Sequence, residues 1–155
     1  MTGLDPVHNT LLEIATIITN YDLDIIATGP VLAIRTSEKR LQAMDRWNQS
    51  THRKSGLLDR VRAEGVTTAE AERQTLNFIK KYCYKKTAPL CGNSIGQDKR
   101  FIAKYMPELE DFLHYKVVDV SSIKVLAKEW YGGRYESPKK KELHRALSDI
   151  EESIE

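Results

Sequence analysis

The first part of the chain alternates between apolar runs and short polar segments in the manner of β-strands. Two strand-like runs cover residues 11–19 (LLEIATIIT) and 25–35 (IIATGPVLAIR), and Asn20–Asp24 separates them. Runs of this kind joined by a short polar segment predict an antiparallel hairpin. The Gly29-Pro30 pair interrupts the second run, which predicts a bulge or an edge position at that point.

From Ser37 onward, helical start signals appear between shorter strand-like runs. Ser37 is expected to cap a helix through about Trp47, and Thr67-x-x-Glu70 is a capping box that opens the clearest predicted helix, about Thr68–Tyr84. The other expected elements are helices at Leu57–Glu64, Gln97–Tyr105, Ser121 or Ser122 to Trp130 and Arg145 to the end, strands at Leu90–Asn93 and Val117–Val120, and a polar loop at Gly132–Lys141. A hairpin followed by strands alternating with helices predicts the α/β class, with a mixed sheet flanked by helices.

Composition narrows the class of protein. The 155 residues are 41% hydrophobic and 30% charged, which suits a single domain, residues 1–155, with a real core. The net charge of +2 argues against a protein that holds long nucleic acid mainly by neutralising phosphates, but not against a short nucleic acid held by few contacts. Cys83 and Cys91 form neither a disulfide framework nor a zinc pattern, which favours a reducing, cytoplasmic compartment. No apolar stretch approaches the ~18 residues of a membrane span.

Two aspartates lie on helix faces that should be apolar. Asp98 is followed at i+3, i+4 and i+7 by Phe101, Ile102 and Tyr105, and Asp149 borders the apolar stripe of the last helix. A carboxylate on a buried face costs several kcal/mol unless it is paired or bound to a metal ion. Either aspartate alone could pair with Arg or Lys, or lie at a rim. Two together could converge on one divalent cation, and oxygen ligands suit Mg²⁺ or Mn²⁺.

A histidine precedes the second of these aspartates. His144 lies five residues before Asp149, about 500° along a helix, so the two side chains would point about 140° apart if both were helical. They can converge only if His144 lies before the helix, which residues 141–143 are long enough to permit. A histidine beside a metal-bound water suits a general base, although near a helix start it is more often an ordinary surface residue. The adjacent lysine run, residues 139–141, is a better candidate for a phosphate contact than the run at 80–86, and both runs are most simply solvated faces.

These residues belong to motifs that resemble a known family of nucleases. His144-x4-Asp149 resembles the third motif, and GNSIGQD, which ends at Asp98, resembles the second motif of exonucleases whose four acidic residues and one histidine serve two metal ions. In the same order along nearly the whole chain, the segments MTGLDP, EIATIIT, GNSIGQD, KYMPELE, LHYK, VDVSS and HRALSDI closely resemble the oligoribonucleases. GNSIGQD together with HRALSDI is specific, whereas TGLDP alone would be weak.

The resemblance implies a fold, an activity and a mechanism. It implies the ribonuclease-H-like fold, a homodimer, and removal of nucleotides from the 3′ end of RNA about two to five nucleotides long, which yields mononucleotides. Two divalent ions, Mg²⁺ or Mn²⁺, about 4 Å apart would clamp the scissile phosphate. By the same resemblance, Asp98 and Asp149 are metal ligands, and His144 takes the proton of the attacking water.

Four further residues resemble contacts to the bases or contacts across a dimer. Leu4 resembles an apolar wedge against a base, and Trp47 resembles a stacking platform, a contact that contributes about 1–3 kcal/mol per base. His114 and Tyr115 resemble residues that reach the site from the partner subunit. Ordinary packing is the alternative explanation for Trp47 and Tyr115.

Three residues resemble a cap on the 5′ phosphate of the substrate: Ser94, Lys116 and Ser121. Many relatives have Arg in place of Lys116. Lysine keeps the charge but lacks the bidentate fork of a guanidinium, so this phosphate cap is expected to be weaker.

The sequence departs from the family pattern at its ends. The family's first motif, a strand with Asp-x-Glu, runs directly into Met-Thr-Gly-Leu-Asp-Pro, and here Met1 is the first residue, while the last helix stops at Glu155. We therefore expect an incomplete domain without the first strand and the end of the last helix, half of a catalytic site, and a chain that is inactive and poorly folded as residues 1–155 alone. Three explanations stay open: a fragment, a natural truncated relative that binds short RNA without cutting it, or an exonuclease of another class, against which LHYK and GNSIGQD argue.

Overall fold

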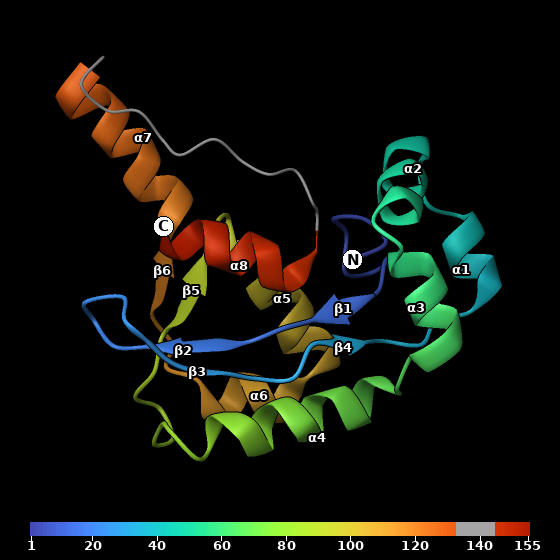
Figure 1. Ribbon diagram of the computed structural model, residues 1–155, viewed down its shortest axis with the longest axis horizontal. Coiled ribbons are helices and arrows are strands. Elements are labelled where there is room, and N and C mark those ends of the chain that lie inside the picture. Colours follow the sequence, from blue (N-terminus) through green and yellow to red (C-terminus); the bar gives the residue numbers. More distant parts are fainter. Residues whose placement is uncertain (133–144) are drawn as a thin grey trace.

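The structure of the protein is a computed structural model, and it describes residues 1–132 and 145–155. Its strands begin with the expected hairpin (Figure 1). β1 (Glu13–Ile14) pairs antiparallel with β4 (Leu32–Ala33), and β2 (Ile17–Thr19) pairs antiparallel with β3 (Ile25–Thr28). The hairpin prediction is confirmed, but each of the two expected runs forms two short strands instead of one long strand.

The second run divides at Gly29-Pro30, where the sequence predicted an interruption. The Gly29 amide donates to the Thr16 carbonyl at 2.8 Å. The ring of Phe78 lies so close that a Cβ on residue 29 would come within 2.7 Å of it. Glycine permits this approach, so the hairpin can bend over the helix that carries Phe78.

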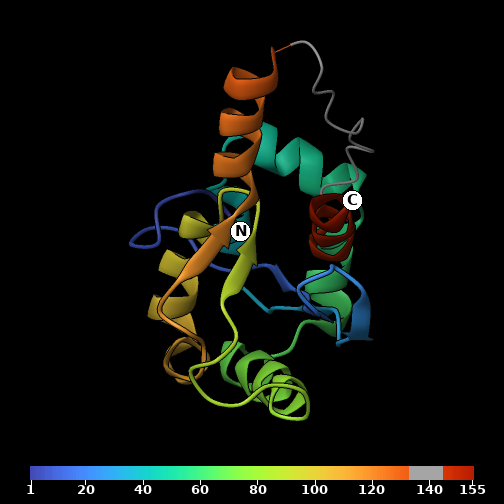
Figure 2. The ribbon, with the colours of Figure 1, turned by 90° about the vertical axis from the view of Figure 1, so that its left-hand side faces the viewer.

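A parallel pair of strands forms the second part of the β structure. β5 (Leu90–Gly92) lies parallel to β6 (Val117–Asp119). Within the described residues the strands form three two-stranded sheets, two antiparallel and one parallel. Figure 2 shows β5 and β6 side by side, with α7 leaving the end of β6. The mixed α/β architecture agrees with the predicted class.

The described ranges contain eight α-helices: α1 (Glu38–Gln42), α2 (Arg46–Lys54), α3 (Leu57–Glu64), α4 (Thr68–Ile79), α5 (Ile95–Tyr105), α6 (Pro107–Phe112), α7 (Val120–Tyr131) and α8 (Ala146–Ile154). The prediction of one helix from Ser37 to about Trp47 is wrong, because two helices, α1 and α2, occupy this region. Ser37 caps α1 as predicted. A second cap begins α2, where the Asp45 carboxylate accepts from the Asn48 amide at 2.8 Å.

The strongest predicted helix starts where expected and ends early. The Thr67 hydroxyl accepts from the Glu70 amide at 3.1 Å. The Glu70 carboxylate binds Arg73 at 2.6 Å instead of turning back to close the capping box. The helix ends at Ile79, five residues before the predicted end at Tyr84.

Two later helix starts also differ from the prediction. Pro107, which follows the expected helix Gln97–Tyr105, opens the additional helix α6, since proline suits the first helical position. Neither Ser121 nor Ser122 caps α7. Asp119 does so, by accepting from the Ser121 amide at 2.9 Å.

The core lies between the hairpin and the helices. One cluster, which includes Ile34, Phe101, Met106 and Leu109, fills the space enclosed by the hairpin, α4, α5 and α6. A second cluster, which includes Leu12, Leu57 and Val61, lies under α1 to α3. Figure 1 shows α4 on one side of the hairpin and α8 on the other. No helix among residues 1–132 and 145–155 has the length and apolar character needed to cross a membrane.

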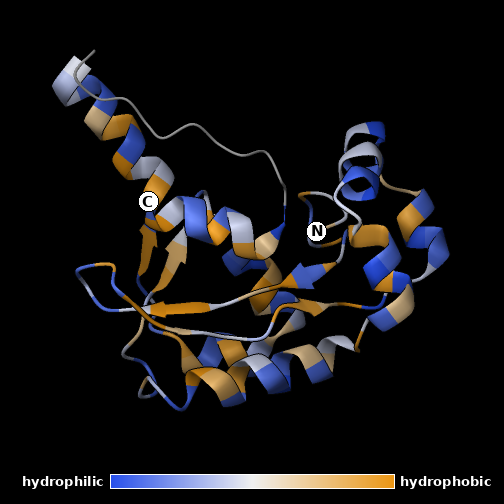
Figure 3. Cartoon of the chain, viewed as in Figure 1, coloured by the Kyte–Doolittle hydropathy of each residue, from blue (hydrophilic) through white to orange (hydrophobic). Residues whose placement is uncertain are grey.

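α7 differs from α4 and α5, the other two helices of similar length in the described ranges, because none of its residues is fully buried. It projects from the body of the molecule beyond β6, and apolar residues remain visible along it (Figure 3). Ile123, Leu126 and Trp130 are 57%, 44% and 69% exposed. Their i, i+3 and i+7 spacing places them on one face of the helix.

Candidate active site

Asp98 and Asp149 interact electrostatically although they belong to different helices. Asp98 lies one turn into α5, and the Phe101 side chain of the same face is completely buried, as the spacing predicted. Burial is the main cause that raises the pKa of the Asp98 carboxyl, and the negative charge of Asp149 raises it further. The amino group of Met1 is buried, and burial lowers its pKa. The negative charges of Asp98, Glu13 and Asp149 act in the opposite direction and raise it. The charges of the two predicted metal ligands therefore act on each other.

A buried carboxylate on β1 holds the start of α8. The Glu13 side chain is 4% exposed. It accepts from Arg145 Nη2 at 2.7 Å, from Arg145 Nε at 3.1 Å and from the Ala146 amide at 2.8 Å. Arg60 of α3 donates to the same carboxylate at 2.8 Å. Glu13 thus both pairs with two guanidinium groups and satisfies an amide at the start of the helix that carries Asp149.

The other end of α8 is attached as well. Asn93, in the turn that leads from β5 to α5, donates from Nδ2 to Ser153 Oγ at 2.6 Å. Asp149 lies between this contact and the one at Glu13, and its amide donates to the Arg145 carbonyl at 2.9 Å. The position of Asp149 is therefore determined by contacts to both β1 and the β5–α5 turn.

His144 lies outside the described residues, and so does the lysine run at 139–141. The first described residue after that segment is Arg145, and α8 begins at Ala146, within one residue of the predicted start. The role of His144 as the base stays a prediction.

The neighbours of Asp98 on α5 hold two other predicted parts of the site. Gln97 Nε2 donates to the carbonyl of Leu4, whose side chain is 71% exposed. Lys99 Nζ donates to the carbonyl of Tyr115 at 2.7 Å, and the Tyr115 side chain is 73% exposed. Three consecutive residues of α5 therefore connect the candidate metal ligand with the candidate base wedge and the candidate cross-subunit residue.

Trp47 lies in the first turn of α2, and its side chain is 62% exposed. The same helix is attached to the start of the chain, because His52 Nε2 lies 3.0 Å from the Met1 carbonyl. The segment that carries Leu4 follows Met1 directly. The two predicted base contacts thus come from segments that touch one another.

The turn before β6 presents two stacked rings. The His114 and Tyr115 rings have centroids 4.5 Å apart, and the Lys116 amide donates to His114 Nδ1 at 3.0 Å. An imidazole that accepts at Nδ1 carries its neutral-form proton on Nε2, so Nε2 remains a donor for another group. The Lys116 ammonium lies 5.8 Å from the centre of the Tyr115 ring.

The two serines of the predicted phosphate cap are in contact. Ser94 Oγ lies 3.1 Å from Ser121 Oγ, and the Ser94 amide donates to Ser121 Oγ at 2.9 Å. Within the described residues, Lys116 makes no hydrogen bond to either serine. The structure therefore assembles two of the three predicted cap residues, from the starts of α5 and α7.

Four residues that help to build this site were missed from the sequence: Glu13, Gln97, Lys99 and Asp119. Glu13 left a signal, because a charged residue interrupts an apolar strand-like run and proves to be buried. Gln97 and Lys99 left none. Each binds a backbone carbonyl far away in the sequence, and such a bond depends on no particular partner side chain.

The candidate site fits a divalent cation in part. Among residues 1–132 and 145–155, no three His, Cys, Asp or Glu side chains gather closely enough to hold a metal ion. Glu13 is already paired with Arg60 and Arg145. Asp98 and Asp149, whose charges interact, are nevertheless suitable oxygen ligands, because a cation would offset both their repulsion and the cost of burying Asp98.

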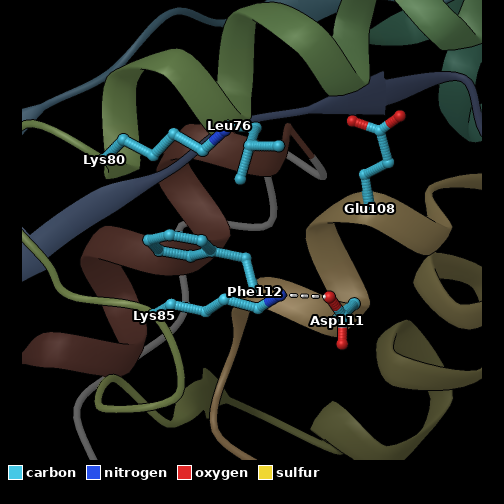
Figure 4. Close-up of a pocket in the computed structure, with 6 residues that line it drawn as sticks. All are labelled: Leu76, Lys80, Lys85, Glu108, Asp111 and Phe112. Atoms are coloured by element: carbon cyan, nitrogen blue, oxygen red, sulfur yellow. Dashed lines mark ion pairs between the residues drawn. The ribbon is translucent and has the colours of Figure 1, made fainter.

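The cavity drawn in Figure 4 is not part of this site. It has a volume of about 240 Å³ and lies between α4 and α6, lined by Leu76, Lys80, Lys85, Glu108, Asp111 and Phe112. Lys85 and Asp111 form an ion pair across it at 2.6 Å. None of the predicted site residues lines it, so it does not bear on the candidate active site.

Comparisons with known proteins identify the family of the chain. A model of the exonuclease family matches residues 1–155. The oligoribonuclease of Paracidovorax citrulli strain AAC00-1 is 52% identical over all of this chain and 80% of its own length. The chain belongs to the oligoribonuclease family of exonucleases. Oligoribonucleases from Aeromonas hydrophila and Haemophilus influenzae strain PittGG are 52% and 51% identical over 99% of this chain and 85% of their own length.

Membership of the oligoribonuclease family confirms the resemblance read from GNSIGQD and HRALSDI, and it makes the chain a nuclease. The mixed α/β fold agrees with the ribonuclease-H-like architecture expected of that family. The individual roles of the site residues stay predictions.

Proposed function

We propose that this oligoribonuclease-family chain removes mononucleotides from the 3′ end of RNA about two to five nucleotides long. The observation that carries the proposal is the contact between the hydroxyls of Ser94 and Ser121 at the start of α5, one turn before Asp98, whose carboxyl interacts with the charge of Asp149. Carboxylates that bind a cation and hydroxyls that bind a terminal phosphate are the two kinds of group that a short oligonucleotide requires. The 52% identity to oligoribonucleases over the whole chain supports this substrate class.

The residues divide into three tasks in this proposal. Asp98 and Asp149 hold a divalent cation, Mg²⁺ or Mn²⁺, which would stabilise negative charge at the scissile phosphate. Two such ions are expected from the family resemblance. The third acid near the described pair, Glu13, orients α8 instead of binding metal. His144 accepts the proton of the attacking water, as the resemblance implies.

Substrate contacts come from exposed residues around the carboxylates. Trp47 stacks on a base and Leu4 wedges against another, which suits side chains that are 62% and 71% exposed. Ser94 and Ser121, together with Lys116, bind the 5′ phosphate. A phosphate cap at a fixed distance from the metal ligands favours short substrates, because a longer chain must displace its 5′ end from the cap.

We also propose a homodimer, with the exposed face of α7 in the interface. Ile123, Leu126 and Trp130 present a continuous apolar face on a helix that has no fully buried residue among the residues that the structure describes. β6 connects this helix to the turn with His114 and Tyr115, the residues expected to reach the partner's site. A second copy of the chain would cover the apolar face and bring that turn to the partner.

The two free thiols, Cys83 and Cys91, suit the proposed cytoplasmic compartment.

The decisive experiment is hydrolysis of a 5′-labelled RNA dinucleotide with Mn²⁺ by the purified chain, both as residues 1–155 and extended upstream by the family's Asp-x-Glu strand, which is expected to restore activity. Release of mononucleotide that stops with EDTA and is lost in Asp98→Ala supports the proposal. Tight binding of the dinucleotide without any product favours the alternative, a relative that binds short RNA without cutting it. Equal cleavage of the corresponding DNA dinucleotide would point to the other class of exonuclease.

A further inference from the structure

One carboxylate joins the first residues of two long helices. Asp119 Oδ1 accepts from the Ser94 amide at 3.0 Å and from the Ser121 amide at 2.9 Å. Ser94 is the N-cap residue of α5, and Asp119 itself is the N-cap residue of α7. The starts of the two helices therefore meet at a single oxygen atom, at the ends of the parallel strands β5 and β6 seen in Figure 2.

This contact also determines the relation between the two serine hydroxyls. Ser121 Oγ accepts from the Ser94 amide at 2.9 Å and lies 3.1 Å from Ser94 Oγ. One hydroxyl can donate to the other, and the remaining hydroxyl hydrogen is then available to an outside acceptor. Ser94 is exposed, so that acceptor can come from solution.

The backbone of Ser94 needs support to remain in this position. Its φ is 51°, in the left-handed region that residues with a side chain rarely adopt. Both hydrogen bonds of its amide, to Asp119 and to Ser121, act on that strained residue. Loss of the Asp119 carboxylate would leave Ser121 Oγ as the only partner of the amide and would allow the two hydroxyls to separate.

We propose that Asp119 is a positioning residue for recognition of the 5′ phosphate: it holds the hydroxyls of Ser94 and Ser121 together so that they can donate to that phosphate. This inference rests on the proposed function. The negative charge of Asp119 does not exclude a nearby phosphate, because the amides that it accepts from lie at helix starts, where partial positive charge offsets it. α5 also carries Asp98 one turn later, so the same contact links the phosphate cap to a candidate metal ligand.

The test compares two substitutions at position 119 on two substrates. The substrates are the same RNA dinucleotide with and without a 5′ phosphate, and the readout is the ratio of their KM values. In Asp119→Ala the preference for the 5′-phosphorylated form is expected to fall by at least about tenfold, the effect of one lost hydrogen bond to a charged group. Asp119→Asn is expected to keep the preference within about twofold, because the amide oxygen of Asn can accept the same two hydrogen bonds.

A matched control separates positioning from loss of a helix cap. Thr67→Ala removes the cap of α4, which has 12 residues like α7, and it should leave the substrate preference unchanged. Calorimetric titration of the same two dinucleotides without divalent cation gives the preference independently of catalysis. An Asp119→Ala protein that keeps the wild-type preference would overturn the inference, as would an Asp119→Asn protein that loses it, or a wild-type protein without any preference. If the wild-type protein cleaves neither dinucleotide but still binds the 5′-phosphorylated form more tightly in the titration, only the proposed nuclease activity toward this substrate is overturned.

Discussion

The guanidinium of Arg145 binds the buried carboxylate of Glu13 across 132 residues of sequence. This ion pair attaches the helix that carries Asp149 to the hairpin. α8 has no fully buried side chain of its own, so its position depends strongly on such polar contacts. The candidate active site is thus held together by a residue that takes no part in the proposed chemistry.

Arg145→Ala is expected to lower the free energy of unfolding by about 2 kcal/mol, the usual contribution of hydrogen bonds to a buried charged group. Because α8 then loses an attachment, the Mn²⁺ concentration needed for half-maximal activity should also rise. The two quantities are measured by urea denaturation and by metal titration of activity. Arg62→Ala is the control, since Arg62 pairs with Glu38 at an exposed position and should change both quantities far less. Equal effects of the two substitutions would contradict the role of Arg145.

Asp98→Asn is expected to abolish cleavage and yet stabilise the metal-free protein at neutral pH. Burial raises the pKa of this carboxyl, so the charged form costs stability above that pKa. The cost disappears as the pH falls below the ordinary value of 3.8. Thermal unfolding in EDTA should therefore show a gain of about 0.5–2 kcal/mol at pH 7 that shrinks toward acid pH. A variant less stable than wild type at pH 7 would show that burial of the charge is not costly here.

Trp47→Ala is expected to raise KM for a dinucleotide while kcat changes little. Loss of one base–aromatic contact costs about 1–3 kcal/mol, roughly 5- to 150-fold in binding. Steady-state kinetics measure the two constants, and Trp47→Phe should recover part of the loss. Tyr21→Ala serves as the control, because Tyr21 is 91% exposed in the turn between β2 and β3, which lies at the opposite end of the molecule from α2 (Figure 1). An unchanged KM in Trp47→Ala would favour ordinary packing for this tryptophan.

Leu126→Glu is expected to convert the proposed dimer into monomers, because a charge in the middle of an apolar interface is costly to desolvate. Light scattering coupled to size-exclusion chromatography measures the mass, and circular dichroism shows whether the fold persists. Tyr84→Glu places the same charge at a side chain that is 84% exposed elsewhere and should leave the mass unchanged. A wild-type protein that is monomeric at micromolar concentration would refute the dimer.

Lys116→Arg is expected to strengthen binding of the 5′ phosphate, because a guanidinium can donate two parallel hydrogen bonds where an ammonium acts as a point charge. KM should fall several-fold for a 5′-phosphorylated dinucleotide and stay constant for the unphosphorylated form. Lys81→Arg, an exposed substitution outside the site, should alter neither value. A uniform effect on both dinucleotides would remove Lys116 from the phosphate cap.

Local signals predicted most elements well. The hairpin, its break at Gly29-Pro30, the Thr67 cap and α3 follow from residues close together in the sequence. The predictions of helix boundaries were wrong where one local signal is compatible with two structures. Pro107 can stop one helix or start the next, and the sequence around Ser121 offers several caps, of which Asp119 is used.

The sequence by itself determined the family, the class of fold and the candidate residues, because motifs such as GNSIGQD and HRALSDI are short and contiguous. Only the tertiary structure decided that the charges of Asp98 and Asp149 act on each other and that Asp119 joins two helix starts. It also decided that Glu13 serves Arg145 instead of a metal ion. The physical reason is that these contacts join segments distant in sequence. Their geometry depends on how the hairpin and helices pack, and no local preference of the chain encodes it.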